Sequence, residues 1–371
     1  MIPNEVIVDL GALAHNFSEI RRIAGPEPRI IAVVKSDAYG HGMIPVAKTL
    51  EAAGVDYFGV FEAEEGVALR QSGCQVPILI MMGVTSEEIP VVIDRGLTPA
   101  LFQIEIAEAL SRMSLEKGTV TPVHIKLDSG MSRLGVYWED LESFLKKLTS
   151  LEGIRIEGMF SHLAVADQPN HAFTDSQVER LKNAVELCRR LVNFRGIVHV
   201  SNSGALLGKK GLELGMIRPG IILYGSPPGE GWAAAASFRP VMTFKSRVIQ
   251  VKTVPPGTPV SYGGTYTTEQ RCTIATIPVG YDDGYSRLLS NTGEVLIHGR
   301  RASVLGRVCM NLTMVDVTRI DGVKEGDEVV LLGAQGNERI TAEEIAKKTG
   351  TISYEVYCTT GKSNRRVYVG P

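Results

Sequence analysis

Short runs of apolar, mostly β-branched residues alternate with amphipathic stretches between residues 10 and 232. Runs of this kind indicate strands that are buried on both faces, as a parallel sheet requires. The clearest helical pattern extends from Asp175 to Leu191, and another follows Asp9, a suitable N-cap, and stops at Gly25-Pro26. The predicted strands are Ile30–Lys35, Asp56–Phe61, Pro77–Met82, Leu97–Phe102, Pro122–Asp128, Ile154–His162, Val198–Asn202 and Gly215–Gly225.

Eight strand–helix units are what a closed (β/α)8 barrel of the TIM type needs, and the length of this segment is typical of one. The alternative is an open, doubly wound sheet. Against it, no Gly-x-Gly-x-x-Gly follows the first predicted strand. The pattern therefore predicts an α/β barrel over residues 10–232.

The pattern changes after Tyr224, where residues 225–236 have the composition of a linker. Beyond it, strand-like segments follow one another closely and are separated by turn signals such as Pro255-Pro256-Gly257. We expect a mostly antiparallel β-domain over residues 233–371, joined by the strand 1–9 and containing one helix near residues 341–348. The predicted strands of this domain are Pro240–Val254, Arg271–Pro278, Gly293–Ile297, Arg300–Val308, Leu312–Val317 and Asp327–Leu332.

Composition narrows the class of protein. Apolar residues make up 44% of the 371 residues, and the net charge of −2 gives no reason to expect binding to nucleic acid or to a membrane surface. No signal peptide or bilayer-spanning stretch is recognisable. The five cysteines are scattered without Cys-x-x-Cys spacing, which favours reduced thiols over disulfides or a metal site. We expect a soluble cytoplasmic protein that binds no metal.

Several polar residues stand where predicted barrel strands end, and carboxyl ends of such strands carry catalytic groups. Lys35 and Lys126 each close an apolar run, although a lysine at this place is more often only a solvated strand terminus. A buried histidine bonded to backbone is likewise the ordinary interpretation of His162. The full set is Lys35, Lys126, His162, Asn202, Ser203, Arg218, Gly220 and Ile221.

The segment Val33-Val-Lys-Ser-Asp-Ala-Tyr-Gly-His-Gly42 closely resembles the cofactor-lysine segment of bacterial alanine racemases, which are fold-type III pyridoxal-phosphate enzymes. The resemblance implies that Lys35 carries pyridoxal 5'-phosphate as a Schiff base. It also implies that Tyr39 helps to hold the cofactor phosphate. At least six blocks of the chain resemble the family, so the resemblance covers nearly its whole length.

The resemblance assigns the cofactor's other contacts as well. Backbone N–H groups at Ser203-Gly204 and Gly220-Ile221, in the loops after the last two strands, fit the usual phosphate position of a barrel. Asn202, beside them, is a further candidate cofactor contact. Arg218 would contact the ring nitrogen, and His162 would stack on the ring. Because arginine does not give up its proton, the nitrogen would stay unprotonated and the cofactor would be a weaker electron sink. Tyr354 is a further candidate hydroxyl donor.

Substrate binding is assigned to the segment that follows Lys126. Arg133 resembles the family's arginine near the substrate carboxylate, which a guanidinium can grip through two hydrogen bonds. In the family Lys126 often carries a CO2-derived carbamate that would orient Arg133. The sequence alone leaves that carbamylation open.

The β-domain resembles the family part that completes the site of a partner chain. Tyr262, in Val260-Ser-Tyr-Gly-Gly-Thr-Tyr266, resembles the second base, opposite Lys35, although a β-hairpin tyrosine is the plainer interpretation. A phenol needs nearby cations to act at neutral pH, and Arg133, or Arg218 through His199, would supply them. The resemblance implies a head-to-tail homodimer in which Tyr354 pairs across the dimer with Tyr262. It places Tyr281 and Met310 at the substrate mouth.

One position departs from the family pattern. Asn311 stands where the family has an aspartate after Met310, which leaves the substrate range open between alanine, serine and other small amino acids. The leading hypothesis is racemisation of alanine, supplying D-alanine for cell-wall synthesis. The alternatives are a broader amino-acid or serine racemase, a cofactor-binding carrier protein without turnover, and a decarboxylase of the same fold group. Decarboxylases of that group usually show a glycine-rich phosphate loop and a Cys-Asp pair, neither of which is present here.

Overall fold

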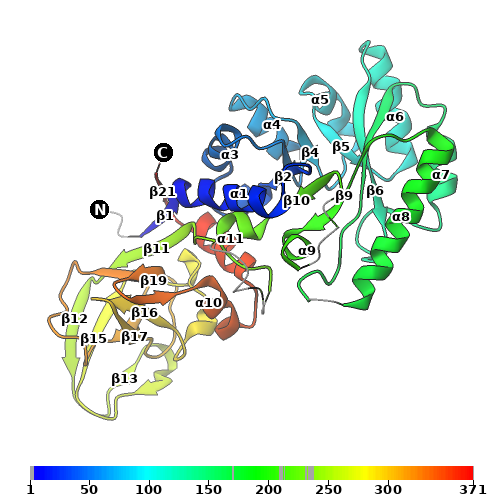
Figure 1. Cartoon of the computed structure of the whole chain (residues 1–371). Coiled ribbons are helices and arrows are strands. Elements are labelled where there is room, and N and C mark those ends of the chain that lie inside the picture. The colour runs from blue at the N-terminus through cyan, green and yellow to red at the C-terminus, as the bar shows by residue number, and fades with distance from the viewer. Residues whose placement is uncertain are drawn as a thin grey trace. The chain divides into compact units, whose positions relative to one another are not determined.

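The computed structural model describes residues 4–168, 171–208, 212, 214–229, 232 and 238–370. The chain divides into two compact units (Figure 1). The barrel unit comprises Leu13–Ala38 and Met43–Phe238, and the β-unit comprises Met1–Ala12, Tyr39–Gly42 and Arg239–Pro371. Part of the predicted linker, residues 230, 231 and 233–237, lies outside the described residues.

Among the described residues, eight parallel strands close into a barrel in the order β2-β3-β4-β5-β6-β8-β9-β10, with β10 pairing back onto β2 and a short strand β7 beside β6. All eight predicted strands form, and the predicted (β/α)8 fold is confirmed. Their bounds are β2 Arg29–Val33, β3 Tyr57–Val60, β4 Ile78–Ile80, β5 Thr98–Leu101, β6 Thr121–Asp128, β7 Val136–Tyr137, β8 Ile154–Phe160, β9 Ile197–Asn202 and β10 Met216–Arg218.

The prediction for Gly215–Gly225 as one strand was too long. The strand β10 stops at Arg218 because Pro219 cannot donate to the sheet, and Ile221–Tyr224 then form the 3-10 helix η2. Lys35 likewise lies beyond β2 and begins the next element rather than ending the strand.

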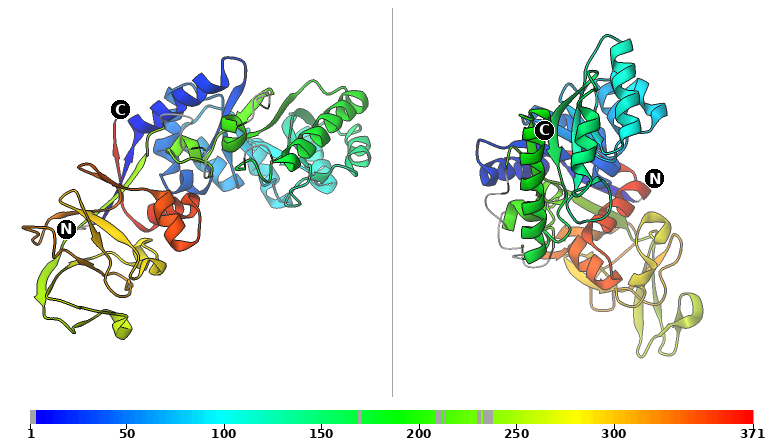
Figure 2. Two further views of the ribbon diagram at one scale, coloured as in Figure 1. Left: turned by 60° about the horizontal axis from the view of Figure 1, so that its bottom comes forward. Right: turned by 90° about the vertical axis from the view of Figure 1, so that its right-hand side faces the viewer.

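Amphipathic helices surround the barrel strands (Figures 1 and 2). Asp9 accepts a hydrogen bond from the Ala12 backbone N–H at 2.8 Å, as expected of the predicted N-cap. The bounds are α1 Leu10–Ala24, α2 Lys35–Tyr39, α3 Met43–Ala52, α4 Ala63–Gln71, η1 Ser86–Glu88, α5 Ile89–Asp94, α6 Ile104–Glu116, α7 Leu141–Leu148, α8 Ala172–Val192 and α9 Ser203–Gly208. None of the helices in the described part of the chain is long and apolar enough to cross a bilayer.

The β-unit is mostly antiparallel, as predicted, and is built around the sheet β17-β16-β19-β11-β1-β21, with β20 beside β19. Its exception is the parallel pair that β1 makes with β21. Smaller sheets are β12-β15-β18 and β13-β14. The strands are β1 Glu5–Asp9, β11 Met242–Arg247, β12 Gln250–Val254, β13 Pro259–Val260, β14 Tyr266–Thr267, β15 Cys272–Ile277, β16 Glu294–Ile297, β17 Arg300–Ser303, β18 Thr313–Asp316, β19 Glu328–Gln335, β20 Glu338–Ile340 and β21 Arg366–Val369.

Two helices lie near the end of the β-unit. The predicted helix forms as α10, Ala342–Thr349, with Thr341 as its N-cap. The helix α11, Ser353–Ser363, was not predicted because its sequence is rich in β-favouring Tyr, Val and Thr. Its buried residues nevertheless recur at helical spacing, so packing overrides propensity. Short 3-10 helices η3 Tyr262–Gly264, η4 Tyr281–Asp283 and η5 Arg287–Leu289 complete the unit.

Candidate active site

The carboxyl ends of the barrel strands bring together most of the polar residues singled out in the sequence. Lys126 lies in β6, Arg218 ends β10 and Asn202 ends β9, while Lys35 and His162 follow β2 and β8 by two residues each. Parallel strands of a closed barrel end on the same face, which is where barrel enzymes carry their catalytic groups.

Lys35 is placed by an unusual turn. Ser36, Asp37 and Ala38 have φ near 54° and ψ near 48°, so they form a left-handed turn directly after the lysine. This conformation is energetically unfavourable for residues other than glycine. Two hydrogen bonds stabilise it here: the Ser36 N–H donates to Glu65 at 2.6 Å and the Met43 N–H donates to Asp37 at 2.7 Å. The Lys35 ammonium lies 5.2 Å from the centre of the Phe61 ring.

Arg218 is buried and held by a chain of hydrogen bonds. Its guanidinium donates to the backbone oxygens of Ser161 at 2.7 Å and Val200 at 3.4 Å, and to His199 Nδ1 at 2.9 Å. His199 Nε2 lies 2.8 Å from His124 Nδ1. Because arginine has no acceptor, His199 Nδ1 accepts, its Nε2–H donates to His124, and His124 carries its own proton on Nε2.

Burial determines the charges of Arg218, His199 and His124. It lowers the pKa of His124 to about 3 and, together with the Arg218 charge, holds the pKa of His199 well below its usual range, so both rings stay neutral. Burial also lowers the pKa of Arg218 to about 9, which leaves the guanidinium charged at neutral pH. The arrangement therefore presents one fixed positive charge at the end of β10.

Lys126, Arg133 and His162 line one small hollow, together with Ser161. Burial, and then the charges of Arg218 and Arg133, lower the pKa of Lys126 to about 7, and its Nζ lies 4.3 Å from the centre of the Phe160 ring. The pKa of His162 is held well below its usual range by burial and by Arg218. A neutral imidazole at this position can stack on a flat ring.

The loops after β9 and β10 form a compact donor site. Ser203 Oγ accepts from the Gly220 N–H at 3.0 Å, and Asn202 Oδ1 accepts from the Ala205 N–H at 3.0 Å. A Cβ on Gly204 would lie 2.3 Å from the Ala166 oxygen, so only glycine fits there. Small residues, a hydroxyl and backbone N–H groups next to a buried arginine suit a flat ring that carries a phosphate.

The remaining predicted site residues, Tyr39, Tyr262, Tyr281, Met310 and Tyr354, belong to the β-unit. Tyr39 lies in the short segment Tyr39–Gly42, which is grouped with the β-unit although barrel residues flank it in the sequence. Tyr39 is buried, which raises the pKa of its phenol, and its ring centre lies 5.8 Å from that of Tyr354. Tyr262, Tyr281 and Met310 are 70%, 43% and 54% exposed.

The Tyr281 and Met310 segments are neighbours. Tyr281 N–H donates to the Cys309 oxygen at 3.1 Å and Asp282 N–H to the Met310 oxygen at 3.0 Å. Ser261, which precedes Tyr262, donates to the Arg307 oxygen at 2.6 Å. These contacts hold three exposed apolar side chains on adjoining segments of the β-unit.

Sequence reasoning missed the side chains that support the site. These are His124 on β6, Ser129 and Ser161 just beyond β6 and β8, and Gln177 and Arg180 on helix α8. All but the partly exposed Arg180 are buried, and none of them was selected. A signal was present for one of them: His124 interrupts the apolar run Val123-His-Ile, which is uncommon unless the histidine has a partner in the interior.

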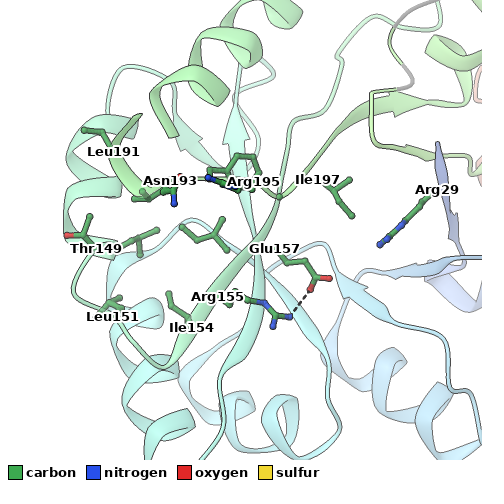
Figure 3. Close-up of a pocket in the computed structure, with 15 residues that line it drawn as sticks. Arg29, Thr149, Leu151, Ile154, Arg155, Glu157, Leu191, Asn193, Arg195 and Ile197 are labelled. Carbon is green, nitrogen blue, oxygen red and sulfur yellow. Dashed lines mark ion pairs between the residues drawn. The ribbon is translucent and has the colours of Figure 1, made fainter. Parts of the chain in front are cut away.

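A second hollow, with a volume of about 780 Å³, lies at the opposite end of the barrel (Figure 3). Its lining comes from the first residues of β2, β8 and β9 and from the last residues of α7 and α8. Arg155 there pairs with Glu157 at 3.9 Å. The amino-terminal face of a barrel is associated with stability rather than catalysis, so this hollow is not the candidate site.

Comparison with known proteins agrees with the geometry. The family models described as alanine racemase, N-terminal domain, and alanine racemase, C-terminal domain, match residues 8–228 and 241–368. Alanine racemase of Syntrophobacter fumaroxidans is 48% identical over 361 residues, covering 96% of this chain and 95% of that protein. The structure of alanine racemase from Clostridium difficile 630 has a TM-score of 0.94 at 38% identity, covering 100% of this chain and 96% of that one.

A further structure, of alanine racemase from Bartonella henselae with covalently bound pyridoxal phosphate, has a TM-score of 0.91 at 28% identity and covers 100% of both chains. The family resemblance predicted from the sequence motifs is thus confirmed. The chain belongs to the alanine racemase family, whose members are isomerases that depend on pyridoxal phosphate.

Proposed function

We propose that this alanine racemase works by a two-base mechanism in which Lys35 acts on one face of the substrate α-carbon and Tyr262 of a partner chain acts on the other. The observation that carries the proposal is the convergence of Lys35, Lys126, His162 and Arg218 at one end of the barrel, with Arg218 held charged by neutral His199.

The residues present fit pyridoxal phosphate. Arg218 would donate a hydrogen bond to the ring nitrogen, His162 would stack on the ring, and Ser203, Gly220 and Ile221, with Asn202, Tyr39 and Tyr354, would hold the phosphate end. When bound, the cofactor supplies an electron sink for the charge left on the substrate α-carbon. Arg218 keeps its proton on the guanidinium, since His199 and two backbone oxygens all accept from it.

The proton chemistry is assigned to two groups. For one enantiomer the unprotonated Lys35 amine would accept the α-proton on its face while the Tyr262 phenol delivers a proton to the opposite face. For the other enantiomer the Tyr262 phenolate would accept the α-proton and the Lys35 ammonium would deliver one, so each turnover exchanges the protonation states of the two groups. The support for a partner's Tyr262 is its exposure together with that of Tyr281 and Met310. Residues that complete another chain's site need to project from their own unit in this way, so their exposure supports the proposed homodimer with shared sites.

Arg133 would grip the substrate carboxylate through its planar fork. Lys126, buried and with a pKa near 7, offers a partly unprotonated amine, which is the form that reacts with CO2. A carbamate on Lys126 would supply the negative charge that orients Arg133 in the hollow that both residues line.

Isotope exchange tests the function directly. Incubated with L-alanine in deuterated water, the enzyme should yield D-alanine with deuterium at the α-carbon. Release of CO2 would instead indicate a decarboxylase. Absence of turnover would indicate a carrier protein, and equal rates with alanine and serine would indicate a broader racemase. Growth of a D-alanine-requiring bacterium that expresses the chain would test the proposed supply of D-alanine for the cell wall.

We place the reaction in the cytoplasm. All five cysteines are free thiols in the structure, as a reducing compartment favours.

A further inference from the structure

One face of helix α8 reaches into the loops that carry the proposed site residues. Phe173, Gln177 and Arg180 follow one another at spacings of four and three, so their side chains lie on the same face. All three approach the loop of residues 129–135, called here the carboxylate loop because it contains Arg133. The helix lies on the outside of the barrel beside α7 (Figure 1).

Arg180 is fixed from two sides. Its guanidinium donates to the Ser129 backbone oxygen at 2.9 Å and its central carbon lies 3.9 Å from the centre of the Trp138 ring. A Cβ on Gly130 would lie 2.7 Å from Arg180 Nη1 and 3.0 Å from Phe173, so the loop approaches α8 closely only because residue 130 is glycine. A guanidinium stacked on an aromatic face keeps its plane while it donates.

Gln177 joins two loops with a fully buried amide. It donates to the His162 backbone oxygen at 3.0 Å and to Ser129 Oγ at 3.4 Å, and it accepts from the Ala164 N–H at 2.9 Å. Ser129 Oγ in turn lies 2.7 Å from Ser161 Oγ, and the Ser161 backbone oxygen accepts from Arg218. One buried polar network therefore connects the carboxylate loop to Arg218.

The carboxylate loop is also constrained within itself. Asp128 Oδ1 accepts from the N–H groups of Gly130 at 2.9 Å and Ser132 at 3.0 Å. Ser132 has a φ of 56°, and beyond it β7 pairs with β6. With both ends tied, the direction of Arg133 depends on where Arg180 and Gln177 hold the start of the loop.

We propose that Arg180, stacked on Trp138, is a positioning residue that fixes the carboxylate loop so that Arg133 meets the substrate carboxylate. Gln177 ties the same loop to the His162 loop. The inference rests on the proposed role of Arg133. It predicts that loss of Arg180 weakens recognition of carboxylates while cofactor binding, which depends on Arg218, His162 and the loops after β9 and β10, stays intact.

The test compares the holoenzymes of Arg180→Ala, Arg180→Lys, Trp138→Leu and the control Arg189→Ala. Arg189 lies on the same helix, is exposed and pairs with Glu186. For Arg180→Ala we expect KM for alanine to rise about tenfold in both directions with kcat changed less than about threefold. The inhibition constant of propionate, an unreactive carboxylate, should rise by the same factor.

Arg180→Lys should recover part of the loss, because an ammonium can donate to the Ser129 oxygen but cannot stack as a plane. Trp138→Leu should give a smaller rise, and Arg189→Ala none. If Arg180→Ala fails to fold, Arg180→Lys and Trp138→Leu carry the test. Unchanged KM and propionate inhibition in the folded variants would overturn the inference, as would a loss of pyridoxal phosphate affinity as large as the change in KM. Wild-type enzyme without racemase activity would instead refute the proposed function.

Discussion

The barrel mouth and the exposed tyrosine segments of the β-unit differ in how their side chains are held. At the mouth, Arg218, His199 and His124 are buried and bonded to one another. In the β-unit, Tyr262 and Met310 are more than half exposed, and only the backbone around them is fixed. The first region is built to present a fixed charge by itself. The second region leaves large side chains in solvent, which supports the proposed contact with a partner chain.

The largest effect is expected from removing the amine at the barrel mouth. Lys35→Ala should abolish the visible absorbance of the bound cofactor and reduce racemisation by about 10³-fold or more, because in the proposed mechanism the amine both holds the cofactor and moves a proton. Absorbance spectra and polarimetry measure the two effects. Turnover that persists without an added amine would contradict the assignment of Lys35.

Tyr262→Phe should lower racemisation by about 10²–10⁴-fold while the cofactor spectrum is unchanged. Exchange of the α-proton should stop for one enantiomer and continue for the other, which NMR in deuterated water can follow. Equal loss for both enantiomers would count against the two-base mechanism.

Mixing the two inactive variants tests whether the sites are shared. A dimer with one Lys35→Ala chain and one Tyr262→Phe chain would contain one complete site if Tyr262 acts on the partner. Refolding equal amounts together should then restore about a quarter of the wild-type activity. Recovery no greater than the sum of the separate variants would show that the sites are not shared.

The buried histidines should make stability depend on pH. The pKa of His124 is about 3 when folded and near 6.5 when unfolded, so below pH 6.5 only the unfolded chain takes up the proton. The free energy of unfolding should therefore fall as pH falls from 6.5 towards 3, by about 1.4 kcal/mol per pH unit for this histidine.

His124→Asn isolates that contribution. At pH 8 the variant should lose about 1–3 kcal/mol, because His199 keeps at best a poorer acceptor. Its deficit relative to wild type should then shrink as pH falls below 6.5, since it lacks the titrating ring. Urea unfolding at pH 8, 6 and 5 measures the difference, and a deficit that stays constant or grows would refute this account of His124.

The sequence predicts some parts of the fold well and others poorly. Apolar runs such as Ile30–Lys35 identify all eight barrel strands, because strands buried on both faces leave a plain signal. The start of α1 was also predicted, since Asp9 caps it locally. The helix α11 was missed because tertiary packing, rather than local propensity, decides it. The strand predicted over Gly215–Gly225 was too long because Pro219, which has no N–H to donate, ends it after Arg218.

The support of the site was harder to predict than its motifs. Lys35 and Arg218 stand in recognisable segments, whereas Gln177 and Arg180 belong to an ordinary amphipathic helix. Gln177 and Arg180 matter because helix α8 packs against the loops that carry site residues. Periodicity alone cannot identify a side chain's partner that lies more than a dozen residues away in the sequence.

The smallest effect is expected in the exposed region, at Asn311. Its amide donates to the Asp282 carboxylate at 3.4 Å, and both residues are exposed. Asn311→Asp would replace that contact with two like charges beside Met310. Because water and salt screen exposed charges, KM for alanine should rise only about twofold at low ionic strength, and the rise should vanish in roughly 0.5 M salt. KM measured at both salt concentrations for alanine and serine checks this. A tenfold or larger rise in KM that persists at high salt would mean that Asn311 is enclosed when the enzyme works. The exposed segments of the β-unit would then be as buried in the assembly as the barrel mouth is in the single chain.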